Sequence, residues 1–254
     1  MLKKITESII ILFIIIMFSS CKQEKILFYP QKLSQDYKYS FDADFKEFFF
    51  KVDDKTKLNG LLFKSDSSKG LIFYLHGNAG SLADWGEVGK LYLNFNYDVF
   101  IFDYRGYGKS QGNISGESQL YNDIQEAYDF IKNGYDEKQI VIIGYSIGTG
   151  LAAHLAMTNN PKMLILIAPF YNMIDLTHHY FKMIPSFLVK YKFKTNEFIL
   201  KISKPILIFH GDKDEVIYYG SSIKLSKLLK NSDRFITLKG QKHNGINDGN
   251  DIFV

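Results

Sequence analysis

The chain has 254 residues, of which 46% are hydrophobic, 16% aromatic and 23% charged, which is enough apolar material to bury the core of one enzyme-sized domain. Its net charge of +4 comes almost entirely from lysines interspersed with Asp and Glu, so no nucleic-acid-binding surface is expected. The single cysteine, Cys21, excludes an internal disulfide.

The first twenty residues differ in character from the rest of the chain. Lys3 and Lys4 precede an apolar run over residues 9–18, and Ser19-Ser20-Cys21 follows. This pattern predicts a secretory signal peptide in residues 1–20, because the run is short for a membrane-spanning helix of about 20 residues. It resembles a bacterial lipoprotein signal, in which Cys21 is acylated and becomes the new N-terminus. An uncleaved signal anchor is the alternative, and either form predicts an exported protein tethered to a membrane of the cell envelope.

Residues 21–46 are interpreted as a lead-in to the catalytic domain, which we expect over 47–254. The domain is predicted to begin with a β-hairpin of strands 47–53 and 57–63. Further strands are expected at 71–76, 98–103, 140–144, 163–168, 205–209 and 234–238, with helices at 82–94, 117–132, 147–158 and 220–229. This alternation predicts an α/β fold with a mostly parallel, twisted sheet covered by helices on both faces.

The most informative motif is G-Y-S-I-G at residues 144–148, directly after the apolar run 140–143. A strand, a sharp turn that exposes a serine and a helix are expected in that order, which is typical of a nucleophile elbow. Glycines at both ends of the motif avoid collisions that a Cβ would cause at so abrupt a reversal. Ser146 is therefore the predicted nucleophile.

A serine hydroxyl needs a base, and in this arrangement an acid and then a histidine should follow it along the chain. Among six histidines, His243 fits best, because it lies in a polar loop after the last predicted strand. His76 and His210 end apolar strands before glycines, so we expect them to bond to backbone beside the site. His154 is expected to be a packing or surface residue, and the pair at 178 and 179 has no metal-ligand partners at suitable spacing.

The acid is expected just after strand 205–209, where three carboxylates follow. Asp214 is preferred because it lies a few residues past the strand end, in a loop able to turn towards His243. Asp212 is the second choice, and Glu215 the third.

An oxyanion needs backbone N–H donors. One is expected from Ile147, the residue after the nucleophile. The other is expected from the small-residue loop that follows strand 71–76, from Asn78 or alternatively from Ala79.

A cap is expected at about residues 170–203, a segment rich in Tyr, Phe and Met that lies between two predicted strands. Such a cap suits an apolar acyl group, although packing on the core is an alternative role for each side chain. The turn at residues 104–108 is interpreted as structural support beneath the site, with Arg105 paired locally.

Together these motifs resemble the α/β-hydrolase superfamily: H-G-N-A-G at 76–80, F-D-Y-R-G-Y-G-K-S at 102–110, G-Y-S-I-G at 144–148, A-P-F at 168–170, H-G-D-K-D-E at 210–215 and His243. The nearest likeness is to its membrane-associated, serine aminopeptidase-like branch, which also has a segment similar to L-F-Y-P at 27–30. The resemblance covers about residues 26–247 and implies acyl transfer to water. Only eleven residues follow His243, so the closing helix usual in the superfamily is expected to be short or absent.

The resulting hypothesis is a serine hydrolase that cleaves an ester or thioester with an apolar acyl group through an acyl-enzyme. We expect a small-molecule or lipid-like acyl substrate, no cofactor, no metal ion and a monomer. A serine aminopeptidase-like peptidase is the nearest alternative. A non-catalytic envelope lipoprotein that uses the fold as a binding module is the other.

Overall fold

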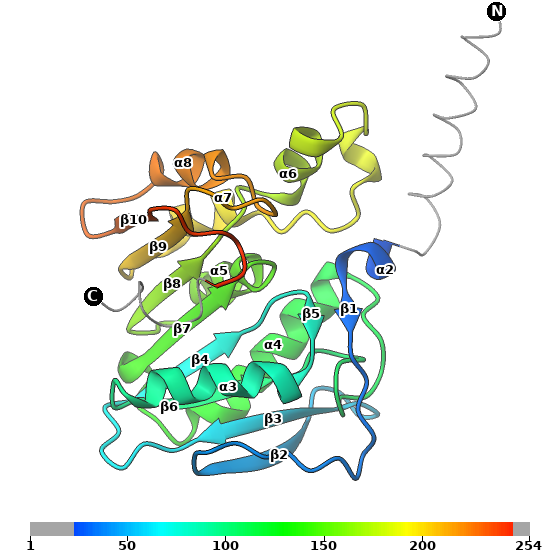
Figure 1. Ribbon diagram of the computed structural model, residues 1–254, viewed down its shortest axis with the longest axis vertical. Coiled ribbons are helices and arrows are strands. Elements are labelled where there is room, and N and C mark those ends of the chain that lie inside the picture. Colours follow the sequence, from blue (N-terminus) through cyan, green and yellow to red (C-terminus); the bar gives the residue numbers. More distant parts are fainter. Residues whose placement is uncertain (1–22, 246–254) are drawn as a thin grey trace, which may run out of the picture.

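The computed structural model describes residues 23–245, so the predicted signal, Cys21 and the segment after Gly245 lie outside the described residues. Eight strands form one sheet in the order β10-β9-β8-β7-β4-β6-β3-β2, as Figure 1 shows. The antiparallel part comprises β2 (Phe45–Lys51) and β3 (Lys57–Phe63), and β3 also pairs antiparallel with β6 (Asp98–Phe102). The parallel part continues through β4 (Leu71–Leu75), β7 (Ile140–Tyr145), β8 (Met163–Ile167), β9 (Ile206–Gly211) and β10 (Arg234–Leu238).

Burial along the strands follows from this order. Every residue of β4, β6 and β7 is buried, as expected for continuous apolar strands covered on both faces. In each of the edge strands β2 and β10 a single residue is buried, and the others are partly or largely exposed.

Helices cover both faces of the sheet, in agreement with the predicted fold class. On one face, α3 (Leu82–Leu93) packs against a core cluster that includes Ile72, Val99 and Ile143. On the other, α4 (Glu117–Lys132), α5 (Gly148–Thr158) and α8 (Gly220–Ser226) contribute to a second cluster, and the short helix η1 (Glu137–Gln139) leads into β7. The predicted helices start within one residue of those observed, but α8 ends at Ser226 rather than at 229.

A cap lies over the carboxyl ends of the strands, at the top of Figure 1. It contains α6 (Met173–Tyr180) and η2 (Ser186–Leu188), and the segment then continues through α7 (Thr195–Phe198) and η3 (Ile199–Lys201), which pack against α5. Glu117 at the start of α4 holds this segment, because its carboxylate accepts the backbone N–H groups of Lys192 and Phe193 at 2.7 and 3.2 Å.

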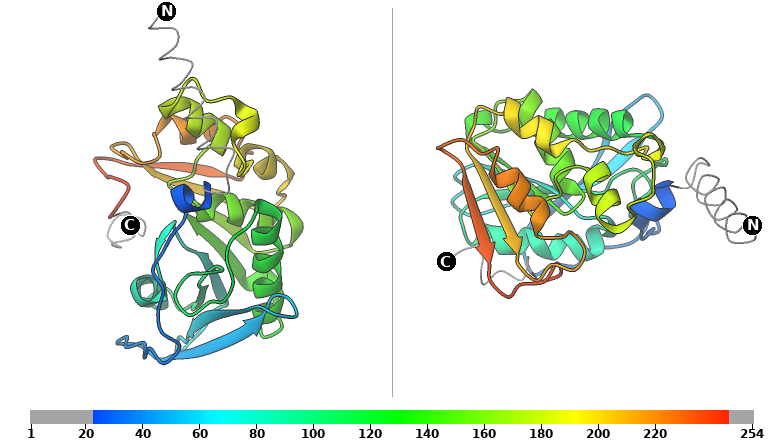
Figure 2. Two further views of the ribbon diagram at one scale, coloured as in Figure 1. Left: turned by 90° about the vertical axis from the view of Figure 1, so that its right-hand side faces the viewer. Right: turned by 90° about the horizontal axis from the view of Figure 1, so that it is seen from above.

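The lead-in before the sheet is ordered by contacts with the site. Its helix α2 (Gln23–Leu27) lies against the cap in both views of Figure 2. Strand β1 (Tyr29–Pro30) then pairs in parallel with β5 (Ala79–Gly80), which belongs to the loop after β4. No helix within residues 23–245 has the length and apolar character needed to cross a membrane.

Candidate active site

Ser146 lies at the turn between β7 and α5, with the backbone geometry that the elbow motif predicts. Its φ of 53° is in the left-handed region, a strained conformation for a residue with a side chain. A Cβ on Gly148 would lie 2.2 Å from the carbonyl oxygen of Leu75, and one on Gly144 would lie 2.5 Å from that of Gly148. The glycines therefore let the elbow press against the end of β4.

The three residues predicted to act together are adjacent in the structure. The hydroxyl of Ser146 is 3.0 Å from Nε2 of His243, and Nδ1 of His243 is 2.7 Å from Oδ2 of Asp214. With Nδ1–H donating to the carboxylate, Nε2 is left to accept the proton of the serine hydroxyl. All three side chains are buried or nearly so.

Asp214, the preferred acid, is the carboxylate that reaches His243. Its Oδ1 accepts the backbone N–H groups of Val216 and Ile217, both at 2.8 Å, which fixes the orientation of the carboxylate. Burial by itself raises the pKa of Asp214, but hydrogen bonds from His210 and His243 outweigh it and hold the pKa well below its usual value. The carboxylate is thus ionised at neutral pH.

The two other carboxylates of this loop have different partners. Asp212 accepts the backbone N–H of Gly240 at 2.6 Å, which ties the loop after β9 to the turn after β10. Glu215 accepts the backbone N–H of His243 at 3.4 Å. Within residues 23–245, the hydrogen bonds of these two carboxylates are with backbone N–H groups, whereas Asp214 is the carboxylate that faces the imidazole of His243.

The sequence did not reveal the full role of His210. As expected, its Nε2 faces a backbone oxygen, that of Ile217 at 2.9 Å, but the same nitrogen is also 3.1 Å from Oδ2 of Asp214. Its Nδ1 is 2.5 Å from the hydroxyl of Ser222. In the sequence, the only sign of this contact is that His210 stands four residues before Asp214. The turn after β9 brings the two side chains together.

The remaining histidines have packing contacts. The ring of His154 stacks on Tyr121 with ring centroids 3.7 Å apart. His76 is fully buried with Nδ1 2.7 Å from the carbonyl oxygen of Gly77, and burial lowers its pKa to about 4, so it is neutral. In the cap, His178 bonds to the carbonyl of Ile184 and His179 stacks on Tyr218.

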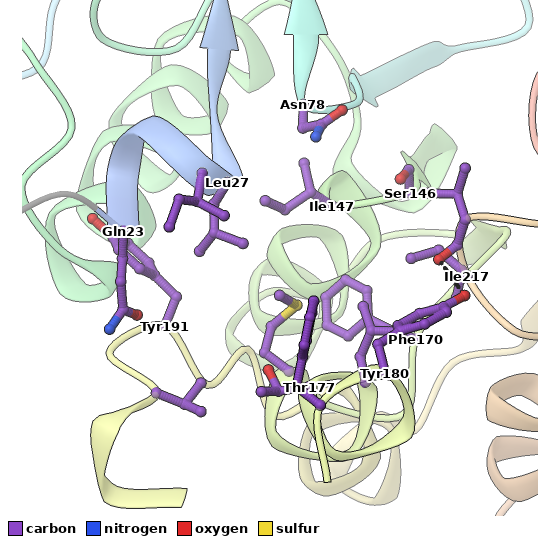
Figure 3. A pocket seen from close by; sticks show the side chains of 16 residues that line it. Gln23, Leu27, Asn78, Ser146, Ile147, Phe170, Thr177, Tyr180, Tyr191 and Ile217 are labelled. Atoms are coloured by element: carbon purple, nitrogen blue, oxygen red, sulfur yellow. Dashed lines mark hydrogen bonds between the residues drawn. The ribbon is translucent and has the colours of Figure 1, made fainter. Parts of the chain in front are cut away.

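The predicted oxyanion donors lie beside the serine. Asn78 and Ile147 line the same cavity as Ser146, as Figure 3 shows. Within residues 23–245 the backbone N–H of neither residue donates a described hydrogen bond, so both are available to an incoming oxygen.

The loop that contains Asn78 is held from several sides. The carbonyl oxygen of Asn78 accepts the backbone N–H of Tyr29 at 2.8 Å and the hydroxyl of Tyr107 at 2.7 Å. The early L-F-Y-P segment and the turn at 104–108 thus position the proposed oxyanion donor. In that turn Arg105 is paired with Asp123 and Asp53, as expected for structural support.

Two cavities meet at Ser146. The first cavity has a volume of about 240 Å³ and lies between α2 and the cap. None of its lining residues is charged. They are Gln23, Ile26, Leu27, Asn78, Ser146, Ile147, Phe170, Met173, Leu176, Thr177, Tyr180, Phe181, Val189, Tyr191, Val216 and Ile217. The second, of about 750 Å³, is more polar and includes Asp84, Glu87 and His243 among its lining residues. A substrate bound at Ser146 can therefore place an apolar part in the first cavity and a polar part in the second.

This sheet, with a serine at the elbow after a central strand and its partners in later loops, is the fold of an α/β hydrolase. Solved structures agree: an esterase from Pyrococcus furiosus, Pf2001, has a TM-score of 0.66 at 20% identity and covers 85% of this chain and 89% of its own. An alpha-beta hydrolase from Vibrio vulnificus has a TM-score of 0.68 at 22% identity, with 80% and 76% covered. At these identities the likeness concerns the fold.

The chain belongs to the serine aminopeptidase S33 family, whose model matches residues 66–199. Among curated relatives, the uncharacterized protein YfhR of Escherichia coli K12 is 31% identical over 208 residues, which cover 76% of this chain and 72% of YfhR. The lysophosphatidylserine lipase ABHD12 of Danio rerio is 33% identical over 197 residues, 69% of this chain. The chain spans about half the length of that relative, with 50% covered.

Proposed function

We propose that the protein is a serine hydrolase that cleaves an ester or thioester with an apolar acyl group through an acyl-enzyme. The observation on which this proposal depends is the hydrogen-bond chain from Asp214 through His243 to Ser146, with Ser146 at the end of an apolar cavity. The esterase and lipase names among the similar proteins support ester substrates.

The proposed reaction uses each contact in turn. Nε2 of His243 takes the proton of Ser146 as the serine oxygen attacks the substrate carbonyl, and the backbone N–H groups of Asn78 and Ile147 stabilise the oxyanion. His243 then gives that proton to the departing alkoxide or thiolate, leaving an acyl-serine. Water loses a proton to the same nitrogen, attacks the acyl group and releases the acid, while the proton returns to Ser146 and Asp214 stays ionised.

A fluorophosphonate probe tests the nucleophile directly. The wild type should be labelled, Ser146→Ala should not, and Ser226→Ala on α8 should be labelled like the wild type. An unlabelled, folded wild type would instead favour a binding module without catalysis.

The lining of the first cavity determines the expected substrate. We expect p-nitrophenyl esters to be hydrolysed faster as the acyl chain lengthens, until the cavity of about 240 Å³ is filled. Longer chains should then react more slowly. A flat response to chain length would argue against acyl binding in this cavity.

A peptidase is the second candidate, because the carboxylates of Asp84 and Glu87 line the larger cavity beside Ser146 and offer partners for a substrate amine. Aminoacyl nitroanilides separate the two candidates. Their cleavage at a kcat/KM above that of every ester tested would favour the peptidase.

We also propose that the chain is exported and held at a membrane of the cell envelope by a lipid on Cys21. The support is the pattern of residues 1–21. In a bacterial host, metabolic labelling with an alkyne fatty acid should mark the wild type and leave Cys21→Ser unlabelled. Equal labelling of both would exclude this attachment site.

A further inference from the structure

The cap exposes large apolar side chains within a few residues of one another. Phe181, Met183 and Phe187 have 62%, 80% and 81% of their surface exposed. Ile26, on α2, is 44% exposed. We call these four residues the cap patch. Exposed apolar groups gathered in this way are uncommon on a soluble surface and indicate an interaction site.

The cap patch is one surface because α2 and the cap are joined. Nε2 of Gln23 donates to the carbonyl of Leu188 at 2.6 Å, and its Oε1 accepts the N–H of Lys190 at 2.9 Å. Figure 2 shows α2 beside this part of the cap in both views. Ile26 and Phe181 also line the apolar cavity that contains Ser146, so the patch borders that cavity on one side.

The charges next to the cap patch are mainly positive. Lys25, Lys182 and Lys190 are exposed within the same segments. The carboxylate there, Glu24, is paired with Lys190 and with the hydroxyl of Tyr191. Apolar side chains bordered by lysines suit the surface of a bilayer that contains anionic lipids.

The path of the chain places this surface near a membrane. The apolar run ends at Phe18 and α2 begins at Gln23, so four residues separate them. Fully extended, four residues span about 14 Å. From Cys21, the proposed lipid attachment site, only Lys22 intervenes. With either form of tether, α2 and the adjoining cap patch stay close to the bilayer.

We propose that the cap patch docks on the membrane leaflet to which the chain is tethered, so that the apolar cavity opens towards lipid and acyl substrates enter it from the bilayer. The docking rests on the proposed tether, and the route of entry rests on the proposed hydrolase activity. A lipid surface, rather than a protein groove, matches a patch that combines exposed Phe and Met with flanking lysines beside the entry of the chain.

Depth-dependent quenching tests the docking without using activity. The full chain is incorporated into vesicles of phosphatidylcholine and phosphatidylglycerol whose acyl chains carry bromine, and one tryptophan is added by Phe187→Trp. The matched control is Phe49→Trp, a position 45% exposed on β2, a strand at the end of the molecule away from the cap in Figure 1 and in the left view of Figure 2.

Bromine should quench the added emission of Phe187→Trp at least about twofold more than that of Phe49→Trp, because only the former reaches the acyl chains. Equal quenching would overturn the proposal. An emission of Phe187→Trp that changes with protein concentration and not with bromination would assign the patch to a second copy, and would also overturn it.

A second variant tests the entry route. Met183 and Phe187 do not line either cavity at Ser146, so Met183→Ser combined with Phe187→Ser should hydrolyse a short soluble ester like the wild type. Hydrolysis of a long-chain ester embedded in vesicles should fall at least about fivefold, because less apolar surface holds the cavity mouth at the bilayer. An unchanged rate on the embedded ester would contradict the route. If the wild type hydrolyses neither ester but the quenching difference persists, the proposed activity fails and the docking stands.

Discussion

Nε2 of His210 lies 3.1 Å from Oδ2 of Asp214, the same oxygen that faces Nδ1 of His243 at 2.7 Å. Nε2 of His210 also faces the carbonyl oxygen of Ile217, so it must carry the proton and donate it. Asp214 therefore receives hydrogen bonds on both oxygens, including one from a histidine that does not touch the serine. His210 is a positioning residue for the acid.

His210→Gln should lower kcat/KM by about tenfold, since a hydrogen bond to a charged group contributes about 1.5–3 kcal/mol and glutamine retains part of it. Without the hydrogen bond from His210, the negative charge of Asp214 attracts the protonated form of His243 more strongly. The acidic limb of the kcat/KM profile should therefore move to higher pH. Ser222→Ala, which leaves the donor in place, should move it less. A loss of rate with an unmoved profile would mean that His210 is only structural.

The choice between the carboxylates is tested by Asp214→Asn and Asp212→Asn. Asp214→Asn should lower kcat/KM by about 10⁴, because an amide cannot hold the imidazole in the required tautomer. Asp212→Asn should keep its rate within about tenfold, since within residues 23–245 the described hydrogen bond of the Asp212 carboxylate is with the backbone N–H of Gly240. The reverse ranking would reassign the acid.

The low pKa of Asp214 also predicts how stability depends on pH. The folded pKa lies below the value of about 3.9 expected in the unfolded chain, so the ionised carboxylate adds stability above that pH. This contribution is lost as the pH falls through the folded pKa. Urea unfolding between pH 6 and about pH 3 should show a smaller decline of the unfolding free energy for Asp214→Asn than for the wild type. Parallel curves would show that this carboxylate does not contribute.

Gly148, two residues after the nucleophile, offers a test of the tight packing of the elbow. Gly148→Ala places a methyl group 2.2 Å from the carbonyl oxygen of Leu75, so the elbow must move relative to β4. We expect a loss of stability of about 1–3 kcal/mol and at least about a hundredfold loss of kcat/KM, because the oxyanion donors separate. Gly116→Ala is the matched control, since its methyl would meet nothing within 4 Å. Thermal unfolding measures the loss of stability, and ester hydrolysis measures the loss of kcat/KM. Equal losses in Gly148→Ala and Gly116→Ala would refute the steric argument.

These tests rest on features that the sequence reveals to different degrees. The strands of the sheet could be predicted because continuous apolar runs such as Ile140–Tyr145 have the length and β-branched content of buried strands. Ser146 and His243 could be placed because each follows a strand end at one edge of a parallel sheet.

Other features depend on contacts between distant segments. The pairing of Tyr29 with the oxyanion loop and the bond from Gln23 to the cap join residues 50 or more positions apart, and no local pattern reports such contacts. The same holds for the wall that α2 adds to the apolar cavity. Only the resemblance of L-F-Y-P to a family segment hinted at a role for this part of the chain.

The apolar cavity allows its proposed use as an acyl site to be tested by filling it. Thr177 lines the cavity on α6, and Figure 3 shows its side chain among the other lining residues. Thr177→Phe should raise the KM of long-chain esters by about tenfold, because overpacking costs about 1–3 kcal/mol when the chain and the new ring compete for one space. Short-chain esters should be affected little, so the preferred chain length becomes shorter. Thr177→Val removes the hydroxyl without filling the cavity and should keep the wild-type preference. If Thr177→Phe slowed all chain lengths equally, the ring would be disturbing the cap, and the acyl group would have to bind on the other side of Ser146.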